Sequence, residues 1–234
     1  MGTPTLTVSM PTWRTPQLRR AVESVLNQTF TDLRLVVVND GDDPWHLLDG
    51  IDDPRLVRFD LKANRGRYWC DAVTLAACGS EWWTPHDADD VSEPDRYEAQ
   101  LVGDVSFTSV MIHGLDGTVT THPIRPGNPI AKYPAGVYRT AVAREVGIHP
   151  LFRVGYDTVF VRRMWDRFDP VVVNRGLYHV HRRSDSLTTS AETGRGSRLR
   201  LEHRRRARQL LRRPSACPQP SALLDDVARL REVL

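Results

Sequence analysis

Three carboxylates gather in the stretch WWTPHDADDVSEPD, where Asp87, Asp89 and Asp90 directly follow an aromatic, strand-like run. Like charges this close repel, so they need a cation, full hydration or a chemical task. Side chains alternate along an extended segment, so Asp87 and Asp89 project in the same direction. Hard oxygen ligands of this kind suit Mg²⁺ or Mn²⁺, and such ions also bind phosphates. The stretch therefore predicts a divalent-metal and phosphate site. A solvated acidic turn, with Asp90 as a helix N-cap, stays open as the alternative.

The elements before this stretch must place it at the edge of a sheet. β-Branched and apolar runs predict strands, and apolar residues at helical spacing predict helices. The predicted strands are 5–10, 33–40, 55–60 and 81–86, and the predicted helices are 16–28 and 67–78. This order predicts an α/β fold with a mostly parallel sheet flanked by helices. Ligands bind at the carboxyl ends of strands in such sheets, so residues 12–13, 39–40 and 87–90 should lie along one edge.

The second half of the chain is predicted to complete the domain and to add a helical extension. The patterns predict helices at 93–101, 139–147, 156–168 and 222–234, a hairpin at 105–124 around Asp116-Gly117, and a strand at 171–183. From about Thr193 the composition becomes Arg-rich and then Pro/Ser-rich. We therefore expect a domain over residues 1–192 and a basic C-terminal helical extension over 193–234.

The composition excludes several classes of protein. With 234 residues, 40% hydrophobic and 26% charged, the chain suits one ordinary domain. No run approaches the roughly 20 apolar residues of a membrane-spanning helix, and the first residues do not resemble a signal peptide. We expect a cytoplasmic protein. Cys70, Cys78 and Cys217 match no zinc or disulfide spacing, so reduced structural thiols are expected.

Basic residues are concentrated in one segment, 195–213, although the formal net charge of the chain is only +3. Three interpretations compete: a solvated helix packed on the domain, a helix lying on an anionic membrane surface, and a contact with nucleic-acid phosphates. We favour the first two, so nucleic acid is not an expected partner and peripheral membrane contact stays open.

Four blocks of the chain resemble glycosyltransferase family 2, the inverting sugar transferases with a Rossmann-like GT-A fold. They are VSMPTWRTPQLRRAVESVLNQTFTDLRLVVVNDGDDP, NRGRYWCDAVTLAACGSEWWTPHDADDVSEPDR, FRVGYDTVFVRRMW and YHVHRRSDSLT, in the family's order and spanning about residues 6–188. The resemblance implies a domain that binds a nucleoside diphosphate-sugar, with a UDP-sugar as the expected donor.

The resemblance assigns the nucleotide base to the ends of the first two predicted strands. Pro11, Thr12 and Trp13 match the loop that meets the base, and an aromatic side chain there can stack on it. Trp13 could also be a packing residue, but it follows a strand end. Asp40 matches the acidic residue that hydrogen-bonds the base.

The metal and diphosphate roles fall on the acidic stretch and its partners. Asp87 matches the first acid of the family motif, followed by Ala88 in the donor-binding loop, and Asp89 matches the metal-binding acid. His181 matches a histidine near the diphosphate that completes the metal site. Arg67 could meet the diphosphate or be a solvated loop charge.

The resemblance assigns catalysis to Asp157. In the family this acid deprotonates the acceptor hydroxyl while the nucleoside diphosphate leaves the opposite face of the sugar, so the configuration inverts. A divalent cation, Mn²⁺ or Mg²⁺, offsets the charge of the leaving group. An acid at a helix start is also favoured by the helix dipole, which is the structural alternative for Asp157.

The chain departs from the family pattern at three places. Tyr156 stands where the family usually has Glu, and Asn39 replaces a common Asp. Cys70, Asp71 and Ala72 occupy the region of a usual Arg-Asn pair. These departures bear on the donor sugar more than on the fold.

The sequence thus predicts a metal-dependent inverting glycosyltransferase that acts on an acceptor hydroxyl of a glycan, a lipid-linked glycan or a natural product. One alternative is a sugar nucleotidyltransferase, but the loop PTWRTP lacks the glycines that such enzymes place after the first strand. The other is a non-catalytic nucleic-acid-binding or scaffold protein. Residues 101–133 show no acceptor signature.

Overall fold

The computed structural model describes residues 2–125, 133–184, 192–194, 196–212 and 217–234. The end of the fourth resembling block, 185–188, lies outside these ranges. The N-terminal half contributes β1 (Leu6–Thr12), α1 (Leu18–Leu26), β2 (Leu33–Asn39), β3 (Leu56–Asp60), α2 (Arg67–Ala77) and β4 (Trp82–Pro85). The C-terminal half contributes β5 (Val91–Ser92), α3 (Arg96–Gln100), β6 (Val105–His113), β7 (Val119–His122), β8 (Gly136–Arg139), α4 (Thr140–Val146), α5 (Asp157–Arg167), β9 (Val171–His181), α6 (Arg198–Arg212) and α7 (Ser221–Arg231).

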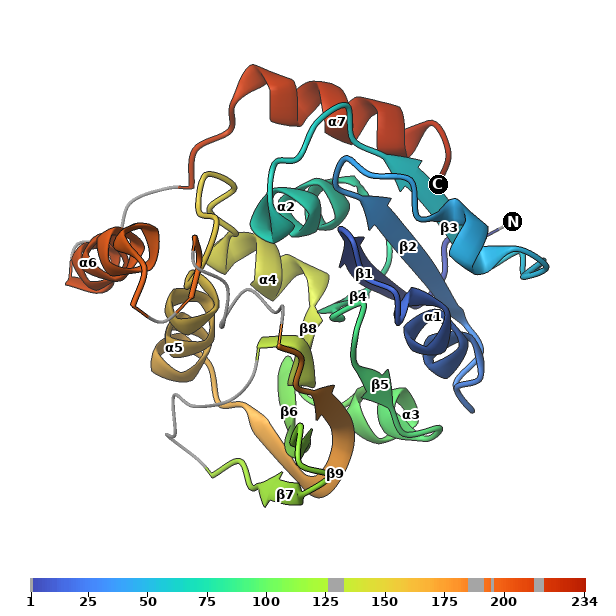
Figure 1. Ribbon diagram of the computed structural model, residues 1–234, viewed down its shortest axis with the longest axis horizontal. Coiled ribbons are helices and arrows are strands. Elements are labelled where there is room, and N and C mark those ends of the chain that lie inside the picture. The colour runs from blue at the N-terminus through green and yellow to red at the C-terminus, as the bar shows by residue number, and fades with distance from the viewer. Residues whose placement is uncertain (1, 126–132, 185–191, 195, 213–216) are drawn as a thin grey trace.

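A single mixed sheet forms the centre, in the order β3-β2-β1-β4-β8-β6-β9-β5, with β7 paired to β6 (Figure 1). Strands β3, β2, β1 and β4 are parallel, as predicted, and their carboxyl ends meet at one edge. Strand β2 is buried on both faces, which explains its continuous apolar run.

The second half of the sheet differs from the mostly parallel arrangement that we expected. Strand β8 is antiparallel to both β4 and β6, whereas β9 is parallel to β6. The predicted hairpin is confirmed as β6 and β7, and Gly117 (φ +79°) provides the left-handed residue of its turn. Asp90 does not begin a helix, because the short strand β5 follows it and α3 starts only at Arg96.

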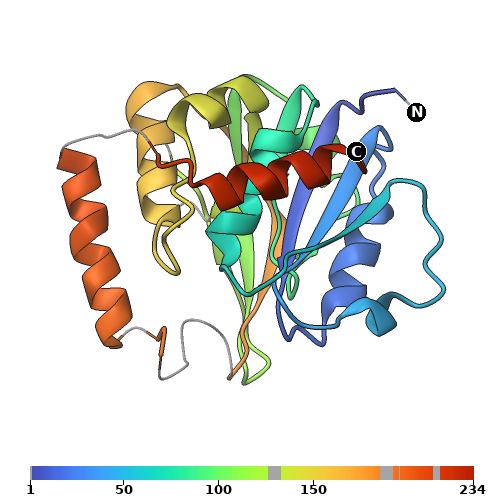
Figure 2. The ribbon, with the colours of Figure 1, turned by 90° about the horizontal axis from the view of Figure 1, so that it is seen from above.

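Helices cover both faces of the sheet, and the alternation of β2 side chains divides the core into two layers. Val36 and Val38 face the layer that contains α2, α4 and α5. Leu35 and Val37 face the layer under α1 and α3. Figure 2 shows α7 lying across the first layer and α6 on the flank beside α5. Trp83 belongs to the first layer and is fully buried.

The two C-terminal helices share this core. In α7, Leu223, Val227 and Leu230 are buried against α2, and Asp226 accepts a hydrogen bond from Trp69 Nε1 at 3.0 Å. In α6 the buried side chains include Ala207. The boundary near residue 192 therefore stays a prediction about sequence organisation. Among the described residues, no helix has the length and apolar character needed to cross a membrane.

Adjacent leucines of α7 offer a matched test of this docking. Leu223 is fully buried and Leu224 is 54% exposed. Leu223→Ala should lower the free energy of unfolding by about 2–5 kcal/mol, because it leaves a cavity against α2. Leu224→Ala should change it by less than about 0.5 kcal/mol. Equal losses in urea unfolding of the two variants would contradict the packing of α7 on the domain.

Candidate active site

The acidic cluster lies directly after β4, at the carboxyl edge of the parallel strands. Asp87, Asp89 and Asp90 can each offer a carboxylate oxygen such that these oxygens all lie within 4.8 Å of one another. Burial and the Asp87 charge raise the pKa of Asp89 to about 6, and burial raises the pKa of Asp90 well above its ordinary value. The negative charges of these carboxylates repel one another, and a divalent cation bound between them would relieve that repulsion. Carboxylate oxygens are also the ligands that such cations prefer.

A buried histidine fixes the backbone of the cluster. His86 Nδ1 donates to the carbonyl oxygen of Asp87 at 2.8 Å, which leaves Nε2 to accept from the Ser92 hydroxyl at 3.0 Å. Burial and the nearby Arg96 lower the pKa of His86 to about 3, so the ring is neutral. The Asp87 N–H donates to Tyr178 Oη at 3.0 Å. The loop therefore has one geometry before any ligand arrives.

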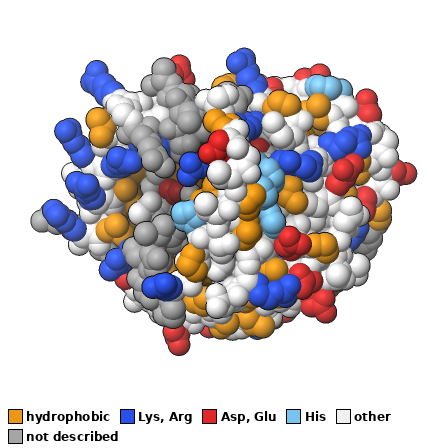
Figure 3. Space-filling view, turned by 60° about the horizontal axis from the view of Figure 1, so that its bottom comes forward, with side chains coloured by type: hydrophobic (Ala, Val, Ile, Leu, Met, Phe, Trp, Pro, Cys, Tyr) orange, Lys and Arg blue, Asp and Glu red, His pale blue; other side chains and the backbone are white. Residues whose placement is uncertain are grey.

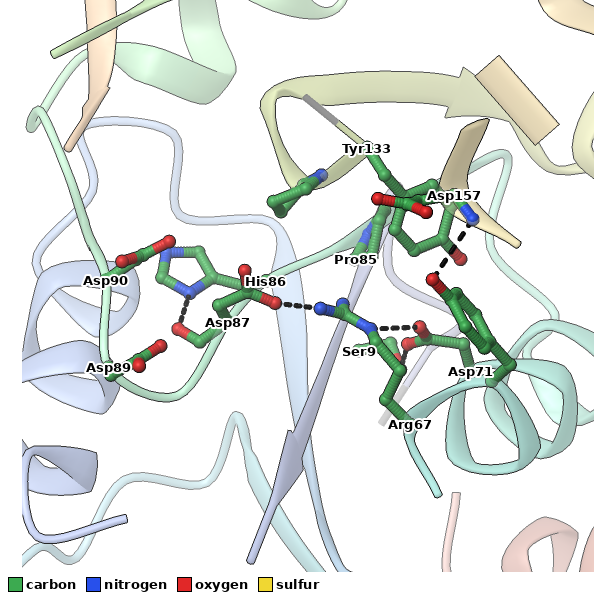
Figure 4. A network of polar contacts seen from close by, with 12 residues as sticks. Ser9, Arg67, Asp71, Pro85, His86, Asp87, Asp89, Asp90, Tyr133 and Asp157 are labelled. Atoms are coloured by element: carbon green, nitrogen blue, oxygen red, sulfur yellow. Dashed lines mark hydrogen bonds and ion pairs between the residues drawn. The ribbon is translucent and has the colours of Figure 1, made fainter. Parts of the chain in front are cut away.

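Arg67 is the cation closest to the first acid. Its guanidinium forms an ion pair with Asp87, and its Nε lies 3.3 Å from Asp71 Oδ2 (Figure 4). Asp71 is fully buried and accepts a hydrogen bond from Ser9 Oγ at 2.8 Å. The guanidinium also lies over the Tyr133 ring, 5.3 Å from its centroid. These contacts form a chain from Ser9 through Asp71 and Arg67 to Asp87.

Sequence reasoning noted Asp71 only as a departure from the family and missed its contact with Arg67. The available signal was spacing, because residues four apart on a helix face each other and can pair. Burial raises the pKa of Asp71 to about 6, against the opposing effect of the Arg67 charge. Asp71 thus orients Arg67, although the burial of its charged carboxylate is unfavourable for stability.

Two further arginines approach Asp89. Arg183 Nε lies 3.2 Å from Asp89 Oδ2, and Arg20 Nη2 donates to the Asp89 carbonyl oxygen at 3.2 Å. The side chain of Arg183 follows β9 and that of Arg20 belongs to α1, so elements far apart in sequence converge on the cluster. Asp87 and Asp89 therefore each have an arginine partner.

His181, a predicted metal ligand, approaches the cluster with its backbone. Its N–H donates to Asp90 Oδ1 at 2.9 Å, while its ring stacks on His113 with the centroids 4.3 Å apart. The ring nitrogens are not part of the acidic group described above. Burial and the nearby Arg20 lower the pKa of His181 to about 4, so the ring is neutral at pH 7. Its role as a metal ligand stays a prediction.

Asp157 is the first residue of α5, and Figure 4 shows it beside Tyr133, on the other side of Arg67 from the acidic cluster. Its backbone N–H donates to Tyr68 Oη at 3.0 Å. Tyr156, which takes the place of the family's Glu, is buried, and its hydroxyl donates to the carbonyl oxygen of Gly147 at 3.0 Å. Position 156 therefore contributes to the hydrophobic core. Asp157 lacks the acidic residue that usually precedes it in the family.

The loop after β1 presents an aromatic side chain to solvent. Trp13 is 42% exposed, whereas Thr12 is buried and Pro11 is half-buried. Arg14 has a positive φ of 50°, and its N–H donates to Asp42 at 2.6 Å. The Arg14 guanidinium lies 4.9 Å from the centre of the Trp13 ring. An exposed ring at the carboxyl end of a strand can stack on a nucleotide base.

Asp40 is only 4% exposed and already has backbone partners. Its carboxylate accepts hydrogen bonds from the N–H groups of Arg65 at 2.6 Å and Gly66 at 2.8 Å. Burial raises its pKa, and these two bonds oppose the shift. Asn39 holds the same turn, because its amide donates to Asp60 and accepts from the Asp42 N–H. Asp40 therefore ties β2 to the loop before α2, and its contact with a base stays a prediction.

The comparisons with known proteins agree with this geometry. Residues 7–168 match the model of glycosyl transferase family 2. WcaA of Escherichia coli (strain K12), named as a colanic acid biosynthesis glycosyl transferase, is 30% identical over 103 residues, or 42% of this chain and 37% of that protein. The chain thus spans little more than a third of the length of this relative.

Two solved structures share the fold. TarS 1–349 of S. aureus in complex with UDP has a TM-score of 0.64 and 17% identity, covering 77% of this chain and 61% of that one. The mannosyltransferase PcManGT from Pyrobaculum calidifontis, in complex with GDP-Man and Mn²⁺, has a TM-score of 0.61 and 14% identity, covering 99% and 70%. The chain belongs to glycosyltransferase family 2 and has the GT-A fold.

The contact between Arg67 and Asp71 generates a stability prediction. Arg67→Met leaves the buried Asp71 carboxylate without its cation, so the free energy of unfolding at pH 7 should fall by on the order of 3 kcal/mol. Adding Asp71→Asn should restore most of that loss, because the unpaired charge is gone. Arg162→Met, which removes an exposed ion pair with Asp166, is the control and should cost less than about 1 kcal/mol. Additive losses in the double variant would refute the pairing.

Proposed function

We propose that this chain transfers a sugar from a nucleoside diphosphate-sugar to an acceptor hydroxyl, in one displacement that inverts the anomeric carbon. The observation that carries the proposal is the cluster of Asp87, Asp89 and Asp90 beside Arg67, with Asp157 facing the same space from α5. Opposed carboxylate groups of this kind provide an acidic metal site on one side and a base on the other.

The donor would lie along the carboxyl edge of β1, β2 and β4. Trp13 would stack on the base, with Pro11 and Thr12 beneath it and Asp40 at its edge. Asp87 and Ala88 would lie along the ribose and diphosphate. Relatives in the same fold have been solved with UDP and with GDP-Man, so both bases are candidates and a UDP-sugar is our first expectation.

The diphosphate would lie between the acidic cluster and Arg67. Asp87 and Asp89 would hold a divalent cation, Mn²⁺ or Mg²⁺, with His181 as a further ligand after a rotation of its ring. Such a cation, when bound, offsets negative charge on the departing diphosphate. Arg67 is placed to share this task, because Asp71 holds its guanidinium at the cluster and a guanidinium binds phosphate through two parallel hydrogen bonds.

Asp157 would act as the general base. Its carboxylate takes the proton of the acceptor hydroxyl as that oxygen attacks the anomeric carbon, and the bond from the anomeric carbon to the diphosphate oxygen breaks on the opposite face. Asp157 lies across Arg67 from the acidic cluster (Figure 4), and this arrangement supports a displacement with the base and the leaving group on opposite faces of the sugar.

Calorimetric titration with UDP, GDP and dTDP, each with and without Mn²⁺, tests the donor site. We expect one nucleotide to bind, and Mn²⁺ to strengthen that binding. Asp89→Asn should weaken the Mn²⁺-dependent binding by more than about tenfold, since even the loss of an outer partner of a metal ligand has that effect.

Asp157→Asn is the matched control, because it removes a carboxylate outside the acidic cluster. It should keep the nucleotide affinity within about twofold while hydrolysis of the donor falls by about 100-fold or more, the range for loss of a general base. A folded wild-type protein that binds no nucleotide under either condition would sink the donor-site assignment.

A further inference from the structure

Helix α6 carries an excess of positive charge that the rest of the chain does not share. It contains seven arginines and one glutamate, whereas the whole chain has 32 basic and 29 acidic residues. The remainder of the chain therefore has three more acidic than basic residues. A charge difference of this size between one helix and its domain sets up a local positive field that attracts anionic partners.

Four of the seven arginines of α6 occupy the face that points away from the domain. His203 and Ala207 are buried, and Leu210 packs against the core, so these residues define the inner face. Spacings of three, four, seven and eleven residues from Leu201 lie on one side of a helix. These positions are Arg204, Arg205, Arg208 and Arg212, all exposed, and together with Leu201 we call them the basic face.

The basic face lacks the ion pairs that neutralise exposed arginines elsewhere. Arg162, Arg167 and Arg175 each pair with a carboxylate. Within the described ranges, no arginine of the basic face has a carboxylate partner, and Glu202 on the same helix pairs with none of them. Figure 3 shows basic side chains gathered along the left edge of the molecule, where α6 lies in Figure 1. The charge is therefore available to an external anion.

An apolar side chain distinguishes between anionic partners. Leu201 lies at the N-terminal end of the basic face and is 49% exposed. Leu151, next to the Phe152 ring that contacts His203 on α6, is 47% exposed. A shallow hollow of about 530 Å³ is lined by Arg198, Leu201 and Arg205, among others. Arginines beside an exposed leucine fit the surface of an anionic bilayer. The arginines can pair with the anionic headgroups, and the leucine can contact the acyl chains. Nucleic-acid phosphates would pair with the arginines but would offer Leu201 no apolar contact.

We propose that the basic face of α6 docks this protein on an anionic phospholipid surface. The proposal concerns a surface outside the donor site and does not depend on the transfer reaction. What this docking would mean for catalysis, however, rests on the proposed function. Helix α6 lies against α5, whose first residue is Asp157, and its first turn lies at the same edge of the molecule as the end of β9 (Figure 2). A bilayer on the basic face would lie on the same flank of the molecule as α5, the helix that carries the proposed base.

The test is co-sedimentation of the full chain with phosphatidylcholine vesicles that contain or lack phosphatidylglycerol, at low and high salt. We expect binding to the anionic vesicles only, and release by salt. Arg204→Glu/Arg205→Glu/Arg208→Glu should weaken partitioning by more than about 100-fold, since each arginine near such a surface contributes about 1 kcal/mol and 1.4 kcal/mol is tenfold. Leu201→Ser should weaken it by about fivefold to tenfold.

Matched controls separate the surface from net charge and from the donor site. Arg58→Glu/Lys62→Glu/Arg125→Glu changes the net charge equally at exposed positions outside α6 and α5 and should retain binding. All variants should melt like the wild type and bind nucleotide unchanged, so failure here is distinct from failure of the proposed function. Absence of binding to anionic vesicles, equal loss in the control, or tighter binding of duplex RNA with Leu201→Ser unaffected would each overturn the proposal.

Discussion

The structure is organised around the electrostatic cost of holding three carboxylates together at the end of a buried strand. Repulsion and burial raise the pKa values of Asp89 and Asp90, so the cluster persists only because other groups compensate. Arg67 and Arg183 supply positive charge, and the neutral His86 fixes the backbone. The sheet order brings these groups together, because β4 lies between β1 and β8 and its end faces the loops of both halves. Carboxylates that repel one another in this way suit a divalent cation, as the proposed function requires.

One departure from the family pattern lies in the same helix as Arg67. The usual Arg-Asn is absent from residues 70–72, and Asp71 stands there instead. Arg67, one helical turn earlier, extends to Asp87 and is held by Asp71. A guanidinium from α2 therefore reaches the first acid of the motif in this chain, although the usual Arg-Asn is absent. The departure at Tyr156 is different, because that side chain is buried and belongs to the hydrophobic core.

Local patterns were sufficient for most of the fold and for the position of the acidic stretch at the carboxyl edge of the parallel strands. The four parallel strands, the helices between them and the hairpin follow from periodicity and turn residues. Strand β8, with four residues, and β5, with two, have no pattern of their own, since each exists through pairing with a distant strand. The direction of the His181 ring depends on side-chain packing, which spacing along the chain does not encode. The Arg67–Asp71 contact is different, because its spacing of four residues on a helix is a signal that sequence reasoning could have used.

The most direct test of the central claim is a crystal structure with Mn²⁺ and the nucleoside diphosphate that binds, using anomalous scattering to locate the ion. The account predicts an ion coordinated by Asp87 and Asp89, with the diphosphate between it and Arg67 and the base against Trp13. An ion away from this cluster, or a nucleotide bound elsewhere on the molecule, would contradict the account.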